Sequence, residues 1–482
     1  MTSSRGPERL LAPAVLGVRD IAALCGGTVT RGDPEACVRG TTADSRAVVP
    51  GMLFVALRGQ RTDGHRFAAE ACRRGAVAVL ASADVPDVPS GAVVVVVPDT
   101  LRALHCVARA VRDREALRVV GVTGSVGKTS TKELIAEVAG RSFRTARSPR
   151  NWNNEIGIPL VFANMPVGTE VAVVELAMRG PGQIHELVSV SRPEIGVVTN
   201  VGESHLDFFD GPEALAREKG VLVETLPPDG VAILNADDAL VFAMRRRTSA
   251  RVLTFGWRAG DVTASEPRTL PGEGSAFRLR TPGGEADVVL PLPGRHAVMN
   301  ALAAAAAGFA LGVPVPEIAA ALGAARVLPM RLAVRRIGEI ILVDDTYNSS
   351  PRSVEAALDV MDELPGAPRI AVLGDMRELG AASRDAHRRV GRLAAGRRFD
   401  LVIAFGPLAA DLAGAADEAG GVRVVHTLEP DEVLRILRRE LRPGAVLLVK
   451  GSRALEMERI VTSIEDERVG DSTVRERGLA WT

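Results

Sequence analysis

The sequence predicts an α/β fold divided into about three domains, and two observations carry this prediction. Short apolar runs of Val, Ile, Leu and Ala alternate with longer helical patterns, as expected of parallel strands that are buried on both faces and joined by helices. The chain has 482 residues, and a domain typically takes about 150.

The predicted strands are the apolar runs at residues 52–57, 76–80, 92–97, 118–122, 171–176, 195–200, 231–235, 340–344, 369–373, 401–405 and 445–450. A helical segment at residues 101–117 begins after Pro98-Asp99, and a new strand–helix series begins near Pro329. We therefore expect domains at residues 1–97, 98–327 and 328–482. The Gly- and Pro-rich segment 266–285 predicts loops between short antiparallel strands.

Charge and cysteine content narrow the class of protein. Lys plus Arg and Asp plus Glu both number 59, so the formal net charge is zero. This argues against broad binding of nucleic acid or anionic membrane, both of which need a basic surface.

The cysteines show no C-x-x-C spacing; they are Cys25, Cys37, Cys72 and Cys106. We therefore expect reduced thiols without a zinc site or disulfide framework.

No segment predicts secretion or membrane insertion. Residues 10–18 are apolar and follow two arginines, but Arg19 and Asp20 interrupt them and no A-x-A cleavage site follows. The longest apolar stretch, residues 301–313, is shorter than the roughly 20 residues that span a bilayer. We expect a soluble, cytoplasmic protein.

The strongest local motif is a phosphate-binding loop at residues 121–130, Gly-Val-Thr-Gly-Ser-Val-Gly-Lys-Thr-Ser. Its glycines let backbone N–H groups approach phosphate oxygens, and the helix that follows adds a positive dipole. Lys128 adds a charge near the β- and γ-phosphates, and Thr129 offers a hydroxyl to magnesium. Val122 stands where the strict pattern has its first glycine. The motif predicts a nucleoside triphosphate site, which kinases, motors, switches and ligases share.

Two polar residues follow neighbouring apolar strands. Glu175 lies at the end of one strand, and His205 follows the next one. Because the carboxyl ends of parallel strands meet at one edge of a sheet, Glu175 is a candidate magnesium ligand and His205 a candidate metal or active-site residue. A solvated strand-end acid and a structural histidine are the alternatives.

Lys219 is predicted to lie on the buried face of a helix that begins at Pro212. It falls within about 60° of Leu215, Leu222 and Leu226 at about 100° per residue. A lysine with a buried stem and a solvated amine is the alternative. A fully buried lysine has a lowered pKa, and its neutral amine can react with carbon dioxide to give an anionic carbamate. Periodicity alone does not decide between these readings.

Taken together, the motifs resemble the Mur ligases and, within that family, most closely the MurF branch of UDP-N-acetylmuramoyl-tripeptide–D-alanyl-D-alanine ligases. The resemblance extends over about residues 18–461 and rests on an ordered series of segments: 44–46, 50–59, 123–129, 151–159, 200–205, 293–296, 344–348, 373–380 and 450–453. Segments 344–348 and 373–380 resemble MurF, and the sequence lacks the Asp-Asn-Pro-Arg segment of the MurE branch.

The resemblance assigns a role to each domain. It implies an N-terminal UDP-sugar-binding α/β domain in which Ser45 and Arg46 contact the nucleotide sugar. It implies a central P-loop ATPase domain and a C-terminal Rossmann-like domain that binds the incoming amine. The implied ATP-binding residues are Gly124, Ser125, Val126, Gly127, Lys128, Thr129, Ser130, Asn300, Arg331, Asp345 and Asn348.

The resemblance also implies two magnesium ions, one held by Thr129 and Glu175 and the other by His205 and carbamylated Lys219. Lys128, His205 and Lys219 are the implied catalytic residues. Two positions depart from the family pattern: Ala297 replaces the usual Asn, and Val126 stands where Asn or Ser is common.

The implied activity is ATP-dependent ligation of D-alanyl-D-alanine to UDP-N-acetylmuramoyl-tripeptide through an acyl phosphate, for peptidoglycan synthesis, by a monomer. Three alternatives stay open. A MurE-type ligase or folylpolyglutamate synthase would take another amine, and a P-loop kinase would form no amide. A nucleotide-binding relative without catalysis would account for Ala297 and Val126.

Overall fold

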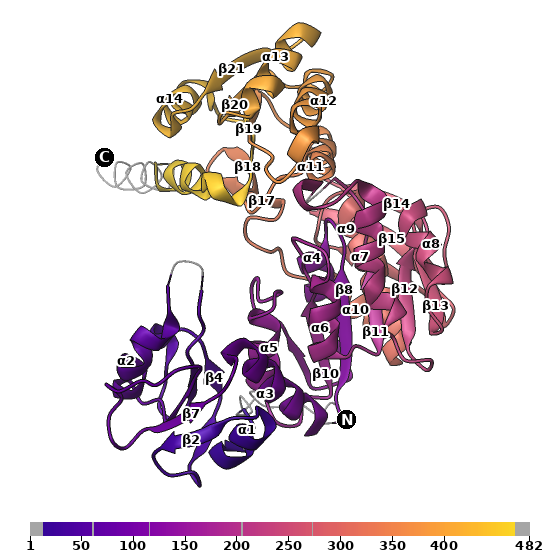
Figure 1. The fold of residues 1–482 in the computed structure, drawn as a ribbon. Coiled ribbons are helices and arrows are strands. Elements are labelled where there is room, and N and C mark those ends of the chain that lie inside the picture. The colour runs from indigo at the N-terminus through magenta and orange to yellow at the C-terminus, as the bar shows by residue number, and fades with distance from the viewer. Residues whose placement is uncertain (1–12, 60–61, 115, 204–205, 272, 468–482) are drawn as a thin grey trace, which may run out of the picture.

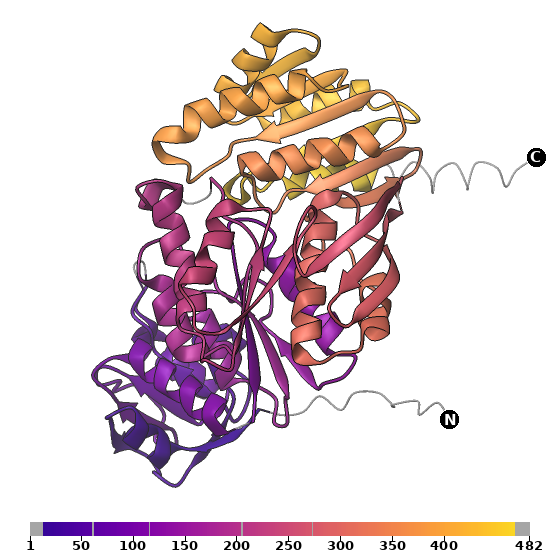
Figure 2. The same cartoon turned by 90° about the vertical axis from the view of Figure 1, so that its right-hand side faces the viewer.

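The computed structural model describes residues 13–59, 62–114, 116–203, 206–271 and 273–467. Three α/β regions follow one another along the chain, and the central one lies between the other two in both views (Figures 1 and 2). The predicted α/β class is confirmed. Within the described residues, no helix is both long and apolar enough to cross a membrane.

The N-terminal region is built on a five-stranded sheet with the order β2-β7-β6-β5-β4. Its strands are β2 (Thr28–Arg31), β4 (Thr41–Thr42), β5 (Leu53–Val55), β6 (Ala78–Ala81) and β7 (Val93–Val96), parallel except for β2. A separate antiparallel pair joins β1 (Val15–Gly17) to β3 (Cys37–Arg39), and the helices are α1 (Val18–Leu24) and α2 (Ala68–Arg73).

The central region holds a nine-stranded sheet with the order β16-β15-β14-β13-β12-β11-β8-β10-β9. The parallel strands are β8 (Arg118–Thr123), β9 (Thr145–Arg147), β10 (Val171–Glu175), β11 (Ile195–Val198), β12 (Val231–Asn235), β13 (Arg251–Gly256) and β14 (Val262–Leu270). The last three strands run antiparallel to one another and end the sheet with β15 (Gly274–Thr281) and β16 (Gly284–Leu290).

Helices cover both faces of the parallel part of this sheet, because neighbouring strand residues point to opposite sides. One face packs against α4 (Lys128–Ala139), α9 (Arg295–Leu311) and α10 (Val315–Gly323). The other packs against α3 (Thr100–Arg114), α5 (Gly157–Ala163), α6 (Gln183–Ser191), α7 (Pro212–Glu224) and α8 (Ala239–Ala243). The apolar stretch 301–313 is thus mostly α9, in which Ala301 and the alanines at residues 303–307 lie fully buried between the sheet and α4.

The C-terminal region holds a six-stranded sheet with the order β17-β18-β22-β19-β20-β21. Its strands are β17 (Ala333–Ile337), β18 (Ile340–Asp345), β19 (Arg369–Gly374), β20 (Leu401–Phe405), β21 (Arg423–Thr427) and β22 (Val446–Lys450), parallel except for β17. The helices α11 (Pro351–Glu363), α12 (Ser383–Ala395) and α13 (Ala409–Ala419) cover one face, and α14 (Pro430–Glu440) covers the other.

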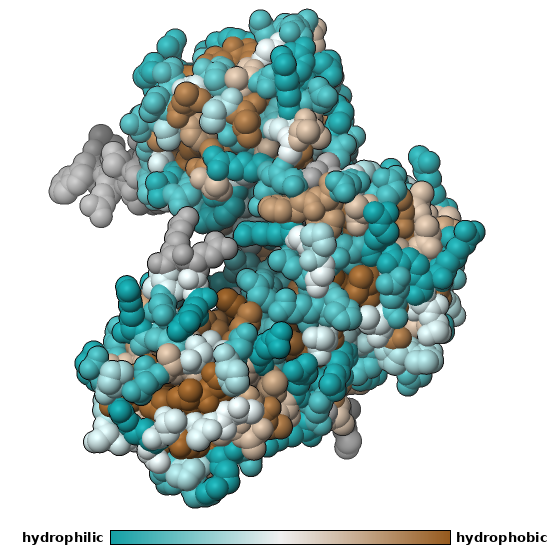
Figure 3. All heavy atoms as spheres, in the orientation of Figure 1, coloured by the Kyte–Doolittle hydropathy of each residue, from teal (hydrophilic) through white to brown (hydrophobic). Residues whose placement is uncertain are grey.

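The three regions are joined in different ways. One continuous apolar core extends from α1 and β7 through α3 and α5 to the central sheet. The Asn164 amide adds a polar link, because it accepts a hydrogen bond from the Thr41 N–H at 2.9 Å and donates one to the Thr41 carbonyl at 2.8 Å. The C-terminal region has apolar cores of its own, and the surface is hollowed between it and the N-terminal region (Figure 3).

Each predicted strand is present, with ends shifted by up to two residues. The prediction for segment 266–285 was partly wrong. The strands there are antiparallel as expected, but they are long, and β14 alone has nine residues. Pro267 is tolerated in β14 because it falls within an irregularity of the ladder between Ser265 and Arg268.

Candidate active site

The phosphate-binding loop lies between β8 and α4, at the carboxyl edge of the central sheet. Gly124 and Gly127 have φ values of 150° and 84°. A Cβ atom at Gly124 would lie 1.9 Å from the Thr199 hydroxyl, and one at Gly127 would lie 2.5 Å from the Asn300 side-chain oxygen. Both positions therefore require glycine, and the backbone stays bare where phosphates would approach.

The loop is held in shape by the residues that follow β11. The Asn200 amide accepts a hydrogen bond from the Val126 N–H at 2.9 Å and donates one to the Val126 carbonyl at 3.0 Å. The Ser125 hydroxyl bonds both the N–H and the carbonyl of Gly202. Because residue 126 is fixed through its backbone, valine at this position is compatible with the loop shape.

Two lysines converge on this loop. The Nζ atoms of Lys128 and Lys219 donate hydrogen bonds to the Gly124 carbonyl at 2.8 and 3.0 Å. Burial lowers the pKa of Lys128, and the Glu175 carboxylate opposes that shift. Burial also lowers the pKa of Lys219 well below its ordinary value, and the Lys128 charge lowers it further. The predicted burial of Lys219 is confirmed, because its exposed fraction is 1%.

Glu175 and Thr129 meet at the end of β10. The Thr129 hydroxyl donates a hydrogen bond to Glu175 Oε2 at 2.7 Å, and the Asn153 amide donates one to Oε1 at 2.8 Å. A hydroxyl and a carboxylate are the hard oxygen donors that magnesium prefers. The pair therefore fits one magnesium ion, which Thr129 and Glu175 would hold. Asn153 lies in the 151–159 motif, but no local pattern predicts its contact with Glu175.

The described residues contain no group of three or more His, Cys, Asp or Glu side chains placed to hold a metal ion. His205 lies outside the described residues, so its predicted role stays a prediction. Among the described residues next to the loop, the Glu175 and Glu378 carboxylates act on Lys128, the Glu218 carboxylate acts on Lys219, and Arg331 adds a further cation.

Arg331 brings the C-terminal region to this site. Its Nη2 atom donates a hydrogen bond to the Thr129 hydroxyl at 3.0 Å, and its guanidinium lies over the Tyr347 ring at 3.8 Å from the centroid. Ion pairs between described residues also join the C-terminal region to the central one: Arg352 pairs with Asp238, and Arg389 pairs with Glu203. The structure therefore brings Arg331 to Thr129 of the phosphate loop, and its predicted contact with ATP stays a prediction.

Asp345 and Asn348, also predicted to contact ATP, face inward within the C-terminal region. Asp345 binds Lys450 Nζ at 2.5 Å and accepts the Leu332 N–H at 3.1 Å. The Asn348 side-chain oxygen accepts a hydrogen bond from the Ser349 N–H at 2.9 Å. The Asn348 backbone carbonyl accepts one from Lys450 Nζ at 2.8 Å. The Asp345 carboxylate also opposes the lowering of the pKa of His296, in the central region, by burial. The predicted contacts of Asp345 and Asn348 with ATP stay predictions.

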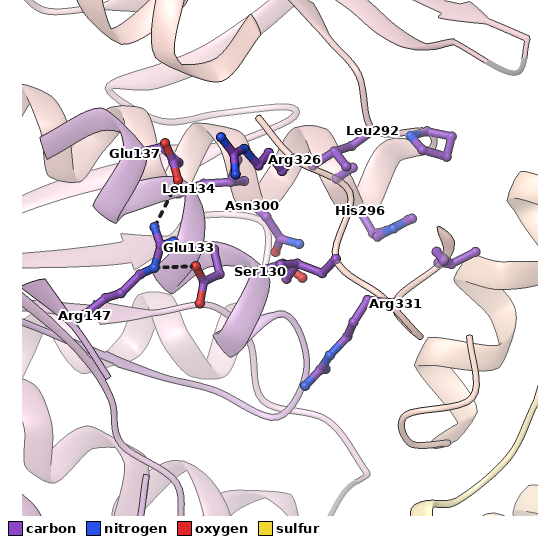
Figure 4. A pocket seen from close by; sticks show the side chains of 14 residues that line it. Ser130, Glu133, Leu134, Glu137, Arg147, Leu292, His296, Asn300, Arg326 and Arg331 are labelled. Carbon is purple, nitrogen blue, oxygen red and sulfur yellow. Dashed lines mark hydrogen bonds and ion pairs between the residues drawn. The ribbon is translucent and has the colours of Figure 1, made fainter. Parts of the chain in front are cut away.

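A cavity of about 110 Å³ opens beside the phosphate loop (Figure 4). Apolar side chains form much of its lining, among them Leu134, Ala297 and Leu332, and Asn300 and Ser130 lie on its wall. Asn300 is fixed because its side-chain oxygen accepts a hydrogen bond from the Thr131 hydroxyl at 3.2 Å. The cavity extends from the loop toward residues 326–332, the connection to the C-terminal region.

Ser45 and Arg46 lie in the N-terminal region, in the short 3-10 helix Ser45–Ala47. Ser45 is buried, whereas the Arg46 side chain is 80% exposed and pairs with Asp44 at 2.8 Å. The Arg46 guanidinium lowers the pKa of Asp44. These two residues lie in the N-terminal region, whereas the phosphate loop lies in the central one.

The fold and the site define an α/β protein of the P-loop class with three regions around one phosphate-binding edge. Family models match the chain at residues 38–112 (Mur ligase family, catalytic domain), 122–308 (Mur ligase middle domain) and 330–453 (Mur ligase, glutamate ligase domain). The chain therefore belongs to the Mur ligase family, as its motifs predicted.

Similar proteins match over nearly their whole length. The UDP-N-acetylmuramoyl-tripeptide–D-alanyl-D-alanine ligase of Bacillus subtilis is 35% identical, covering 93% of this chain and 98% of that protein. The Escherichia coli enzyme of the same name is 36% identical, covering 88% and 93%. A crystal structure of MurF from Acinetobacter baumannii has a TM-score of 0.87 at 29% identity, covering 95% and 100%. MurF ligase from Thermotoga maritima in complex with ADP has a TM-score of 0.80 at 28% identity, covering 90% and 98%.

Proposed function

We propose that this chain is an ATP- and magnesium-dependent ligase that joins D-alanyl-D-alanine to UDP-N-acetylmuramoyl-tripeptide for peptidoglycan synthesis. The contact of Arg331 with Thr129 is the observation that carries the proposal, because it places the C-terminal region directly at the phosphate loop. A ligase needs this arrangement to bring an amine to an activated acid, whereas a nucleotide-binding scaffold does not. The names of the 35–36% identical relatives supply the substrates.

The chemistry explains why a phosphate loop serves an amide-forming enzyme. A carboxylate is a poor electrophile, because its charge repels the amine and oxide is a poor leaving group. Transfer of the γ-phosphoryl group of ATP gives an acyl phosphate, which the dipeptide amine attacks with release of phosphate. The protein then has to position three reactants and neutralise crowded negative charge.

The chain supplies the groups for this work. The bare backbone of residues 124–130 would hold the triphosphate, and Lys128 and Arg331 would balance its charge. Thr129 and Glu175 would hold one magnesium ion, which polarises phosphoryl oxygens when bound. His205 and carbamylated Lys219 are proposed for the second ion. The low pKa of Lys219 supports this assignment, because only a neutral amine reacts with carbon dioxide.

The remaining assignments divide the substrates among the regions. Ser45 and Arg46 are proposed to contact the UDP-sugar. The cavity beside Asn300 is proposed for adenine, and Ala297 leaves its wall apolar. Asp345 and Asn348 are proposed to contact ATP, which would require their present hydrogen bonds to rearrange.

The proposed domain boundaries near residues 97 and 327 fall between β7 and α3 and between α10 and β17. We propose a cytoplasmic monomer.

Phosphate release provides the direct test. The enzyme is supplied with ATP, magnesium and UDP-N-acetylmuramoyl-tripeptide, with and without D-alanyl-D-alanine. Stoichiometric phosphate and pentapeptide product are expected only when both substrates are present. Formation of ADP and a stable phosphorylated product, without phosphate release or an amide, would favour a kinase, and the absence of turnover under all conditions would favour a non-catalytic relative.

A further inference from the structure

Beneath the phosphate loop, α4 carries a lysine whose side chain has no contact with solvent. Lys132 is fully buried, with an exposed fraction of 0%. Its Nζ atom donates a hydrogen bond to the Ser148 carbonyl at 2.6 Å and pairs with Glu133 Oε1 at 2.8 Å. A fully buried lysine is rare unless it is paired, so these two contacts explain how the ammonium is accommodated.

Ser148 connects this lysine to the strand that ends in Glu175. The Ser148 N–H donates to the Val173 carbonyl at 3.0 Å, and the Ser148 hydroxyl accepts the N–H of Glu175 at 3.2 Å. Ser148 is itself fully buried. Lys132 thus holds the backbone of Ser148 in place, and the Ser148 hydroxyl in turn holds the backbone N–H of Glu175.

The same helix also holds the Glu175 side chain. Thr129 lies three residues before Lys132 on α4, so both side chains lie on one face of the helix. Thr129 binds the Glu175 carboxylate directly, at 2.7 Å. The helix that follows the phosphate loop therefore determines both the position of the Glu175 backbone and the orientation of its carboxylate.

A chain of ion pairs extends from Lys132 to the wall of the cavity. Glu133 Oε2 pairs with Arg147 Nε at 2.8 Å, and Arg147 Nη1 pairs with Glu137 Oε1 at 3.0 Å. Figure 4 shows Arg147 between the two glutamates on the cavity wall. Glu133 thereby uses one oxygen for the buried lysine and the other for an arginine at the cavity.

We infer that Lys132 is a positioning residue for magnesium binding, which acts through Ser148 to hold Glu175 beside Thr129. This inference rests on the proposed function of Glu175 as a magnesium ligand. Lys132 does not contact the phosphate-facing side of the loop in this arrangement. Its removal should therefore affect the metal and leave the metal-independent affinity for nucleotide largely intact.

The test measures ATP binding by calorimetry as a function of magnesium concentration, without peptide substrates. Lys132→Met keeps the length and apolar stem of the side chain but removes the donor to the Ser148 carbonyl and the partner of Glu133 Oε1. The apparent magnesium affinity should fall by roughly 10- to 100-fold, as it does when a residue that supports a metal ligand is lost. ATP affinity in EDTA should change by less than about twofold.

Three further variants make the result decisive. Ser148→Ala removes the acceptor for the Glu175 N–H and should reproduce the magnesium defect even if Lys132→Met fails to fold. Arg141→Met removes a long cation just beyond the end of α4, whose partner is Glu317 on the surface, and should leave the magnesium affinity unchanged. Glu175→Gln gives the size of the effect when the ligand itself is lost.

Unchanged magnesium affinity in a folded Lys132→Met, or in Ser148→Ala if Lys132→Met does not fold, would overturn the inference. Equal losses of ATP affinity with and without magnesium would also overturn it, because they indicate a general disturbance of the loop. If Glu175→Gln has no effect on magnesium, the metal assignment and the inference fail together. If the enzyme ligates a different amine, only the proposed substrate is wrong, and the binding result stands.

Discussion

Lys128 and Lys219 share one hydrogen-bond acceptor, the carbonyl oxygen of Gly124, although the lysines lie on different helices. Two ammonium groups that bond to the same oxygen repel each other, and burial disfavours the charged form of both lysines. The pKa of Lys219 is lowered well below its ordinary value, first by burial and then by Lys128. The arrangement therefore favours a neutral amine at Lys219, the form that reacts with carbon dioxide.

The first prediction is that Lys219 acts as a carbamate. Lys219→Ala should be nearly inactive, and acetate should partly restore turnover by supplying an anionic oxygen in the vacated space. The wild-type enzyme equilibrated with ¹³C-bicarbonate should give a carbamate NMR signal that is absent from Lys219→Ala. Ordinary turnover by Lys219→Ala would rule out this role.

The second prediction concerns stability and pH in buffer free of carbon dioxide. The folded-state pKa of Lys219 lies below its unfolded value near 10.4, so between these values the unfolded chain binds more protons. The buried amine therefore destabilises the fold at neutral pH, and this cost declines as the pH rises toward about 10.

Lys219→Met should accordingly be more stable than the wild type at pH 7, with a gain that shrinks at higher pH. Urea unfolding at several pH values measures the free energy of unfolding. Arg217→Met, an exposed residue on the same helix, should show no such trend. A pH-independent difference for Lys219→Met would mean that its amine is not responsible.

The third prediction is that Lys128→Ala lowers turnover by roughly 10²–10³-fold or more while the protein stays folded. The loop should keep its shape, because Asn200 and Ser125 hold it independently of Lys128. Activity and thermal melting are compared with those of the wild type. Near-normal turnover, or an unfolded variant, would contradict the assignment.

The fourth prediction is that Arg331→Met lowers kcat more than it raises the KM for ATP. Arg331 contacts the phosphate loop from the C-terminal region, so its loss should weaken the closed arrangement in which the reactants meet. Arg336→Met, which removes an exposed arginine from β17, serves as the matched control. Equal kinetic constants for Arg331→Met and the control would show that the contact is dispensable.

The fifth prediction is that the region from about Leu328 onward selects the amine. D-alanyl-D-alanine, meso-diaminopimelate, L-lysine and L-glutamate are offered in turn, and product formation is measured. The dipeptide should be preferred, because the MurF-like segments 344–348 and 373–380 lie in this region. Preference for a single amino acid would indicate a sister ligase.

The buried strands could be predicted from the sequence, because each is a short apolar run covered on both faces. Strands with exposed faces or edges escaped this signal: β21 is mostly exposed or half-buried, and β9 has no fully buried residue. The long strands β14 to β16 were underestimated because their polar, Gly-containing sequence resembles loops. Exposed strands retain less of the hydrophobic pattern on which such predictions depend.

The site residues also differ in how far local sequence patterns could predict their positions. Lys219 was placed correctly because its burial follows from helical periodicity within a few turns. The contacts of Asn153 with Glu175 and of Arg331 with Thr129 depend on how separate loops and regions meet, which no local pattern encodes. The inward pairing of Asp345 with Lys450 was likewise not predictable, because its partner lies 105 residues away.

The apolar core shared by the N-terminal and central regions has a consequence for substrate length. The two regions cannot turn against each other without exposing that core and breaking the Asn164–Thr41 pair, whereas the C-terminal region meets the central one through polar contacts. With the uridine end of the substrate bound at Ser45 and Arg46 as proposed, the N-terminal and central regions keep the distance from this site to the phosphate loop constant. A stem peptide one residue shorter or longer would present its carboxylate out of register with the phosphate loop, even if every individual contact remained available.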